Sequence, residues 1–526
     1  MSCRFYIRAH RSGSTLSLRT ETINSLQEIV GKANVLTDIN DLYAYSFERI
    51  YRARWIPKID AVVKTESLKE TRAVKRLADE EGFIVAQRGK TVDSERTSKP
   101  IIVLDDSETL RLKKFEKTIK TFADDIKEFR ETENGTLGKL AIAQKLSFLD
   151  KPTAKCEECN SCSSYCTVAS SFNGIETWSA KGRMLLMRGM TRGELPISPK
   201  TVEILYTCSN CGLCFAECLQ HTEFPEAIRA TRRQLTLQGH TPQIFKVAAE
   251  NILKAGDPGG PSSRKRRLSW LGMDPKQRFE KTADVLYWVG CTVATRTSKT
   301  AKATANILNC AEVNFTVLGE KEGCCGYVLL ASGLWDEAKK NAKKLIEKVG
   351  KTRAQLIVTS CAGCYYTFTK LFPEIIDVEM PCDVLHTSQF IEELIGEGRL
   401  DFGSFDEKVT YHDPCSLGRH TKVYDSPRNV LSKIPNLQFV EMPLSKSRSR
   451  CCGGGGGLWS YDNRVSMNSA LNRLVRDVVP LRVNVLATAC PTCQMNLRYS
   501  STRNSIPIEV CDFAEIVETA MVNVHY

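Results

Sequence analysis

Cys291, Cys324-Cys325-Gly326 and Cys361-Ala-Gly-Cys364 form a cysteine pattern that the chain repeats as Cys415, Cys451-Cys452-Gly453 and Cys490-Pro-Thr-Cys493. Between the lone cysteine and the Cys-Cys-Gly lie 32 residues in the first copy and 35 in the second, and 34 and 36 residues separate the Cys-Cys-Gly from the closing Cys-x-x-Cys. Corresponding cysteines are offset by 124, 127 and 129 residues, which predicts a duplication with small insertions. We call the two sets the first-copy and second-copy cysteines.

Apolar segments in front of these cysteines predict that each copy is an α/β domain. Strands are expected at 285–289, 313–318 and 355–359 and again at 409–412, 437–441 and 483–487, with helices at 334–349 and 465–479. The lone cysteine and the Cys-x-x-Cys follow strands in both copies, and the carboxyl ends of parallel strands meet at one edge of a sheet. We therefore expect five thiols to converge in each of two domains, at residues 280–400 and 401–526.

Five thiols in this arrangement suit an open iron–sulfur site. Of two adjacent cysteines, one can bridge two irons while its neighbour binds one, and Gly326 and Gly453 give the backbone freedom to pass close to the metal. Such a site is more open than a cubane, so sulfur atoms of a substrate can approach its irons.

A second kind of cysteine motif precedes the duplication. Cys156-x-x-Cys159-x-x-Cys162-x-x-x-Cys166 and Cys208-x-x-Cys211-x-x-Cys214-x-x-x-Cys218 both have the spacing of bacterial ferredoxins, which we call the first and second ferredoxin runs. Zinc sites also use Cys-x-x-Cys, but as isolated pairs, so two four-cysteine runs favour iron. Thr167 and Leu219 stand where ferredoxins usually have proline.

In two-cluster ferredoxins the last cysteine of each run binds the other cluster. One [4Fe-4S] cluster is therefore expected on Cys156, Cys159, Cys162 and Cys218, and the other on Cys208, Cys211, Cys214 and Cys166. With helices expected at 178–190 and 201–206, residues 151–275 are predicted to be an α-helical ferredoxin domain, similar to respiratory iron–sulfur subunits.

In the N-terminal part, strands are expected at 61–63, 83–85 and 101–104, with a helix at 67–81. The phrases at residues 35–38, 41–46 and 58–63 follow one another in an order that resembles the opening of FAD-linked D-lactate or glycolate dehydrogenases. The family's glycine-rich loop would fall at residues 88–94, which contain one glycine, Gly89. We expect a small degenerate α/β domain at 21–107 that does not bind FAD, followed by a helical linker at 108–150.

Composition limits the setting. The 526 residues include 22 cysteines, and no run of about 18 apolar residues predicts a membrane span. Clustered cysteines favour metal binding in a reducing cytoplasm over disulfides. Residues 1–20 lack acidic side chains, which fits either a flexible tail or an organellar transit segment, and we expect a tail.

The net charge of +12 does not predict a nucleic-acid partner, because the basic residues are spread along the chain. The dense run Arg264-Lys265-Arg266-Arg267 follows a Gly/Pro-rich connector at 256–261. A solvated linker is the expected interpretation, and a docking patch for an acidic redox partner is the alternative.

The duplicated Cys-Cys-Gly pattern joined to two ferredoxin runs resembles the catalytic subunit of heterodisulfide reductase in its fused form, over about residues 150–526. The resemblance implies that each five-cysteine set holds a noncubane [4Fe-4S] cluster and that the two together split a disulfide in one-electron steps. One cluster would take Cys291, Cys324, Cys325, Cys361 and Cys364, and the other Cys415, Cys451, Cys452, Cys490 and Cys493. Many members of this family in lactate, glycolate and glycerol-phosphate dehydrogenases have lost one of the motifs and serve mainly as electron relays, whereas both motifs are intact here.

The sequence thus predicts a multidomain iron–sulfur oxidoreductase that reduces a disulfide or oxidises thiols. Its partner would be a flavoprotein, another redox subunit or a soluble electron carrier, and contact with a membrane would come only through a partner. The alternative is an electron-transfer subunit of a flavin-dependent 2-hydroxyacid dehydrogenase that delivers electrons to a quinone or to electron-transferring flavoprotein.

Three polar residues and four further cysteines are weaker candidates. His412, Asp413 and His420 flank Cys415 and are candidates both for proton donation to a leaving thiol and for packing. The five glycines at 453–457 either cradle an anionic substrate or crowd against the cluster. Cys3, Cys310, Cys382 and Cys511 lie outside every motif, and we expect them to be small buried hydrophobic residues.

Overall fold

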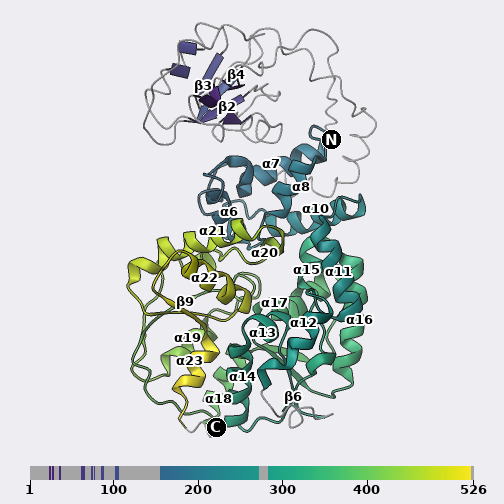
Figure 1. The fold of residues 1–526 in the computed structure, drawn as a ribbon, viewed down its shortest axis with the longest axis vertical. Helices are drawn as coiled ribbons and strands as arrows, with labels where there is room; N and C mark the ends of the chain where they lie inside the picture. The colour runs from purple at the N-terminus through teal and green to yellow at the C-terminus, as the bar shows by residue number, and fades with distance from the viewer. Residues whose placement is uncertain are drawn as a thin grey trace. The chain divides into compact units, whose positions relative to one another are not determined.

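The computed structural model describes residues 155–271 and 282–522, together with short segments between residues 23 and 105 (Figure 1). The chain forms two compact units. One comprises residues 1–147 and 182–197, and the other comprises residues 148–181 and 198–526.

The N-terminal unit contains a four-stranded sheet. Its strands β1 (Val35–Leu36), β2 (Ala61–Lys64), β3 (Ile84–Gln87) and β4 (Ile101–Asp105) lie in the order β1-β2-β4-β3. β2 and β3 pair with β4 in parallel, and β1 is antiparallel to β2. The three strands expected here are confirmed, whereas the loop at 88–94 and the linker at 108–150 lie outside the described residues.

The segment that carries the ferredoxin runs is helical, with no strand among residues 155–271. Its α-helices are α6 (Thr167–Ser170), α7 (Ala180–Thr191), α8 (Pro199–Tyr206), α9 (Leu213–Ala216), α10 (Phe224–Leu237), α11 (Gln243–Ala255) and α12 (Pro261–Lys265). α8 begins where Ser198 accepts a hydrogen bond from the Thr201 amide at 3.1 Å, with Pro199 in the first turn. α11 ends at Gly256, whose φ of 72° is the left-handed conformation that glycine supplies at a helix end.

Each Cys-Cys-Gly domain has a sheet whose pairings are all parallel, as expected from the sequence. In the first copy, β5 (Val285–Trp288), β6 (Phe315–Thr316), β7 (Leu356–Thr359) and β8 (Asp383–His386) have the order β6-β5-β7-β8. In the second, β9 (Lys408–His412), β10 (Gln438–Phe439), β11 (Val485–Thr488) and β12 (Glu509–Asp512) have the order β10-β9-β11-β12. The sequence analysis missed β8 and β12, because both are short and only partly apolar.

The helices between these strands largely match the expectation. The first copy contains α13 (Cys291–Arg296), α14 (Ser298–Cys310), α15 (Tyr327–Ser332), α16 (Trp335–Gly350), α17 (Ala362–Tyr366) and α18 (Thr387–Gly396). The second contains α19 (Asp425–Ser432), α20 (Leu458–Tyr461), α21 (Asn463–Arg473), α22 (Pro491–Arg503) and α23 (Phe513–Ala520). The helix expected at 465–479 changes to a π-helical turn at Leu474–Val478.

The two copies pack against each other through their helices, α14 against α23 and α18 against α19 (Figure 1). Thr300 of α14 donates a hydrogen bond to Glu515 of α23 at 2.8 Å, and Asn429 of α19 donates one to Glu392 of α18 at 2.6 Å. These contacts hold the cysteine edges of the two sheets at fixed positions relative to each other.

Arg232 of α10 connects the helical segment to both copies. Its fully buried guanidinium donates to the carbonyl oxygens of Leu205 and Cys208, to that of Ala331 in the first copy and to that of Gly456 in the second, at 2.6–3.1 Å. One side chain therefore joins α8, the second ferredoxin run and the two duplicated domains.

The basic run at 264–267 differs from the expectation. Arg267 is 2% exposed and pairs with Asp257 and Glu322, each at 3.0 Å. The Gly256 carbonyl accepts a hydrogen bond from the Cys324 amide at 2.8 Å. Both predictions for this run, a solvated linker and an exposed docking patch, are therefore wrong for Arg267. Its side chain is buried, and the connector before it is hydrogen-bonded to the first Cys-Cys-Gly loop.

Candidate functional site

The first-copy cysteines converge at the carboxyl edge of their sheet. Cys291 follows β5 and starts α13, and Cys361 follows β7 and caps α17. The Sγ atoms of Cys291 and Cys324 lie 3.9 Å apart. Cys325 is hydrogen-bonded to Cys324 and Cys364, and Cys364 also to Cys361, so the structure brings all five thiols into one group.

The second-copy cysteines form an equivalent group. The Sγ atoms of Cys452 and Cys493 lie 3.2 Å apart. Cys451 is hydrogen-bonded to Cys415 and Cys452, and Cys493 also to Cys490. Apart from the half-buried Cys291 and Cys415, the thiols of both sets are buried.

Backbone amides in the Cys-Cys-Gly loops point at these sulfur atoms. The Gly326 amide donates to Cys324 Sγ at 3.4 Å, and the Gly453 amide donates to Cys451 Sγ at 3.2 Å. Gly453 has a φ of 82°, and a Cβ there would lie 2.5 Å from Cβ of Ser469. The five-glycine stretch is therefore a loop in tight contact with its surroundings, and three of its glycines, Gly454, Gly455 and Gly457, also line the cavity described below.

The two ferredoxin runs lie against each other. Cys162 has Cys156, Cys166 and Cys218 as electrostatic neighbours, and burial raises its pKa well above the ordinary range. Cys214 has Cys208 and Cys211 of its own run as neighbours, together with Cys162 and Cys166 of the other run. The last cysteine of each run thus lies near the thiols of the other run.

The second ferredoxin run contacts the second-copy cysteines directly. The thiols of Cys211 and Cys451 are hydrogen-bonded to each other, which lowers the pKa of Cys211 and raises that of Cys451. Ser209 Oγ lies 3.6 Å from Cys451 Sγ, and Arg419 donates to the Cys211 carbonyl at 2.8 Å. Sulfur atoms of the two motifs are therefore adjacent at this point.

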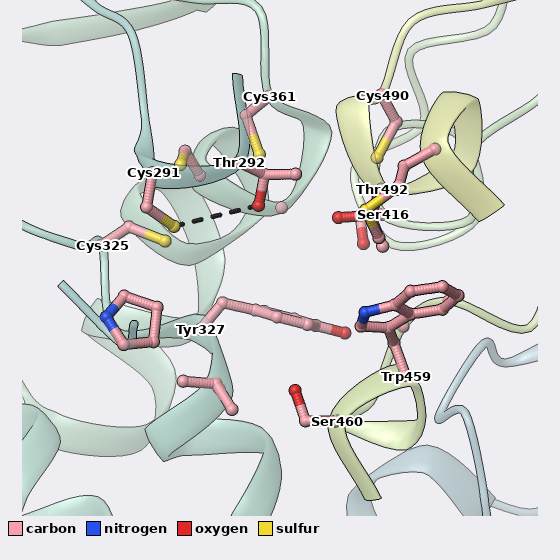
Figure 2. Close-up of a pocket in the computed structure, with 18 of the residues that line it drawn as sticks. Cys291, Thr292, Cys325, Tyr327, Cys361, Ser416, Trp459, Ser460, Cys490 and Thr492 are labelled. Atoms are coloured by element: carbon pink, nitrogen blue, oxygen red, sulfur yellow. Dashed lines mark hydrogen bonds between the residues drawn. The ribbon is translucent and has the colours of Figure 1, made fainter. Parts of the chain in front are cut away.

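A cavity of about 260 Å³ lies between the two copies (Figure 2). All five first-copy cysteines line it, together with Cys415, Cys452, Cys490 and Cys493 of the second copy. Tyr327 projects across it toward Trp459, and Tyr327 Oη accepts a hydrogen bond from the Gly456 amide at 3.2 Å. No charged side chain of the described residues lines this cavity.

The three polar candidates near Cys415 do not line the cavity. Asp413 pairs with Arg428 at 2.7 Å and accepts a hydrogen bond from the Lys446 amide at 2.7 Å. His420 stacks on Tyr366 with ring centroids 4.5 Å apart, and burial lowers its pKa to about 3. His412 is buried beside Cys452, and its pKa is lowered by burial. The surroundings of Asp413 and His420 favour the packing interpretation over proton donation into the cavity, whereas His412 is hydrogen-bonded to Cys452 of the second-copy set.

The cysteines outside the motifs differ in burial. Cys511 is buried, as expected, whereas Cys310 and Cys382 are only half-buried, and Cys3 lies outside the described residues. Sequence reasoning missed Tyr327, Glu322 and Arg419 as site residues. A tyrosine directly after a Cys-Cys-Gly was a usable signal for the first, whereas nothing in the sequence marks the other two.

The donor sets fit iron–sulfur clusters. Soft thiolates select such clusters, and amide hydrogen bonds to the sulfur atoms are a known means of tuning them. Such bonds occur in the ferredoxin runs, among them one from the Asn210 amide to Cys208 Sγ at 3.3 Å and one from the Thr222 amide to Cys218 Sγ at 3.5 Å. Among the described residues, no helix is long and apolar enough to cross a bilayer.

Comparison with known proteins gives one family match and several relatives. The family model described as a cysteine-rich domain matches residues 285–369 and 409–498. The D subunit of the dihydromethanophenazine:CoB–CoM heterodisulfide reductase of Methanosarcina barkeri is 30% identical over 384 residues, 70% of this chain and 93% of the relative. Its counterpart in Methanosarcina mazei is 34% identical over 321 residues, 60% of this chain and 78% of the relative. An EtfAB:quinone oxidoreductase of Syntrophomonas wolfei is 28% identical over 339 residues, 61% of this chain and 47% of the relative.

Proposed function

Because the chain belongs to the heterodisulfide reductase catalytic subunit family of iron–sulfur oxidoreductases, we propose that it reduces a disulfide of small thiols in the cavity between its two copies. The observation that carries the proposal is that nine thiols from two complete five-cysteine sets line one cavity. A disulfide has two sulfur atoms, and its reduction consumes two electrons and two protons to give two thiols. Two thiol sets that face the same cavity could therefore supply one electron to each of the two sulfur atoms.

We propose that four [4Fe-4S] clusters bind the chain, two cubane and two noncubane. The cubane clusters would be held as the sequence predicts, one by Cys156, Cys159, Cys162 and Cys218 and the other by Cys208, Cys211, Cys214 and Cys166. The noncubane clusters would be held by the first-copy and second-copy cysteines. When bound, the four clusters supply one-electron transfer from a partner to the substrate sulfur atoms. In this proposal the cubane clusters belong to the domain at residues 151–275, and the noncubane clusters belong to the domains at 280–400 and 401–526.

The contact of Cys211 with Cys451 supports a direction for the electrons. Cys451 is the one second-copy cysteine that does not line the cavity, and its thiol meets the second ferredoxin run instead. The second copy therefore lies between the ferredoxin runs and the cavity. We infer that electrons enter from a flavoprotein, another redox subunit or a soluble carrier at the ferredoxin runs and reach the cavity through the second copy.

The walls of the cavity indicate the substrate class. Hydroxyl groups of Thr292, Ser416 and Thr492 face it and can donate hydrogen bonds to substrate sulfur (Figure 2). Ile244 and Val247 of α11 also line it and are 45% and 42% exposed, so its apolar side reaches the surface. Uncharged walls favour a disulfide whose arms are apolar next to the sulfur atoms, because a buried charge without a partner is costly.

The test is disulfide reduction by anaerobically purified holoprotein with reduced viologen as electron donor. We expect viologen oxidation on adding small disulfides, with two thiols released for each two electrons consumed. Cys324→Ser and Cys451→Ser should abolish it, and Cys382→Ser, outside the motifs, should not. Holoprotein with full iron that consumes no disulfide would contradict the proposal.

The second candidate is an electron-transfer subunit without its own substrate. The observation in favour of this candidate is the relative named as an EtfAB:quinone oxidoreductase. The match covers 61% of the present chain and 47% of that relative. The same assay separates the two functions, because a relay would oxidise viologen only with a flavoprotein or quinone acceptor present.

A further inference from the structure

The first-copy cysteines lie beside a neutralised arginine. Arg267 is an electrostatic neighbour of Cys291 and Cys324. It is ion-paired with both Asp257 and Glu322, and all three side chains are at most 2% exposed. Glu322 also accepts hydrogen bonds from the amides of Val289 and Gly290, at 2.9 and 2.8 Å, which together with Arg267 oppose the rise in its pKa that burial causes. The charge of Arg267 is therefore offset by two acidic side chains in direct contact, and Lys348 is a further electrostatic neighbour of Arg267 and Glu322.

The second-copy cysteines lie beside an arginine of the opposite kind. Arg419 is 8% exposed and has Cys211, Cys415 and Cys451 as electrostatic neighbours. Its hydrogen bonds run to the backbone carbonyls of Cys211, Ser447 and Ser449. No ion pair to Arg419 occurs within residues 155–271 and 282–522, so its charge is not offset by a carboxylate in direct contact.

The other charged groups near the second-copy thiols are paired or are held neutral by burial. Asp413 and the exposed Glu441 pair with Arg428, and Arg450 and Arg473 pair with Asp477. Asp512 is a buried neighbour of Cys490, and burial raises its pKa well above the ordinary value, which favours the neutral form. The positive charge of Arg419 therefore distinguishes the second site from the first.

His412 adds a second difference. A ring nitrogen of His412 lies within 4.8 Å of the Cys452 and Cys493 sulfur atoms, and the side chain is hydrogen-bonded to Cys452. The residue is 1% exposed, and its Nδ1 has no hydrogen-bond partner among the described residues. By the offset of 124 residues the first copy has Trp288 at this position, packed edge-on against Phe368.

We propose that Arg419 and His412 make the second-copy site the more easily reduced of the two, so that it accepts each electron before the first-copy site. This inference rests on the proposed function. Reduction adds a negative charge to the site, so a nearby unpaired cation and a hydrogen bond to a ligand sulfur both favour reduction. The charge of Arg267 is offset by Asp257 and Glu322, so it gives the first-copy site less of this stabilisation. The site in contact with Cys211 is then also the one with the higher potential, which makes the first transfer downhill.

The test is a redox titration of holoprotein followed by electron paramagnetic resonance. The transition lost in Cys451→Ser is assigned to the second copy, and the transition lost in Cys324→Ser to the first. We expect the second-copy transition at the higher potential. His412→Leu and Arg419→Met should each lower the second-copy potential and leave the first unchanged, and His412→Gln, which keeps an N–H donor, should lie closer to the wild type than His412→Leu. Glu322→Gln should raise the first-copy potential.

Three results would overturn the inference. The first is a first-copy transition at a potential equal to or higher than that of the second copy. The second is a difference between the two potentials that neither His412→Leu nor Arg419→Met makes smaller. The third is the loss of about four irons per chain in His412→Leu, which would make His412 a ligand. Because potentials are measured without substrate, each of these results leaves disulfide reduction itself untouched. If the two potentials differ as predicted but the holoprotein reduces no disulfide, the proposed function is refuted and the inference about the potentials is not.

Discussion

Arg232 allows a sharp test of how the helical segment is held to the two copies. The substitution Arg232→Met keeps side-chain length and removes every hydrogen bond from the guanidinium. The carbonyls of Cys208, Ala331 and Gly456 each lose a buried donor. At about 1 to 3 kcal/mol for each unsatisfied buried group, with part recovered by relaxation, we expect a loss of about 3 to 5 kcal/mol.

The neighbouring Arg233 is a matched control. It pairs with Asp336 at 2.9 Å, and the Asp336 side chain is 66% exposed. Exposed pairs of this kind contribute about 0 to 1 kcal/mol, so Arg233→Met should cost no more than that. Charge and size change equally in the two variants. Arg233 is half-buried and also contacts the Gly333 carbonyl and the Trp335 ring, but among the described residues it does not bond buried carbonyls of three segments as Arg232 does.

Thermal unfolding of iron-loaded protein under anaerobic conditions measures the difference. The decrease in Tm is the loss in free energy of unfolding divided by the unfolding entropy, which scales with the number of residues. For a unit of roughly 360 residues, this gives a decrease in Tm of about 4 to 7 °C for Arg232→Met and below about 1.5 °C for Arg233→Met. Iron per chain is determined for both. Equal shifts for the two variants, or an Arg232→Met within about 1 °C of the wild type by this scale, would refute the role of Arg232 as a connector.

Buried groups and the metal give three further predictions. Glu322→Ala leaves the Arg267 cation without one of its two carboxylates and should destabilise the protein by about 3 to 5 kcal/mol, which a decrease in Tm relative to the exposed-site variant Glu320→Ala would show. Burial lowers the pKa of His386 to about 3, so the unfolded chain binds a proton first as the pH falls below about 6.5. Stability should therefore decrease by up to about 1.4 kcal/mol per pH unit there, and His386→Asn should flatten the Tm profile between about pH 7 and 5; an unchanged slope would exclude His386 as the cause. Removal of iron by a chelator should lower the Tm by far more than removal of any single side chain, because metal binding contributes to folding, and an apoprotein with the Tm of the holoprotein would contradict this.

The cysteine register and the apolar segments in front of the cysteines together predicted the two parallel sheets and the convergence of thiols at their edges. A strand that ends at a cysteine places that cysteine at a known edge, so Cys291 and Cys415 could be positioned from the sequence. The short strands at Asp383–His386 and Glu509–Asp512 could not, since a few residues with a polar start give no periodic signal.

The buried charges beside the two sets of thiols could not be predicted from the sequence, for a different reason. Arg267 and Arg419 both stand in polar stretches that look solvated, and only tertiary contacts bury them. Arg267 meets Glu322 from 55 residues away, and Arg419 meets the Cys211 carbonyl across 208 residues. Contacts at such separations are invisible to local patterns, although they decide the electrostatics of the two sites.

The most direct test of the central claim is electron paramagnetic resonance of oxidised, iron-quantified holoprotein with and without small thiols. Four complete clusters predict about 16 irons per chain. We expect a new signal that appears only with thiol and is absent in Cys324→Ser and Cys451→Ser, because substrate sulfur then reaches the paired sites in the cavity. A full complement of iron with a spectrum that no thiol changes would contradict the account and favour the electron-transfer subunit.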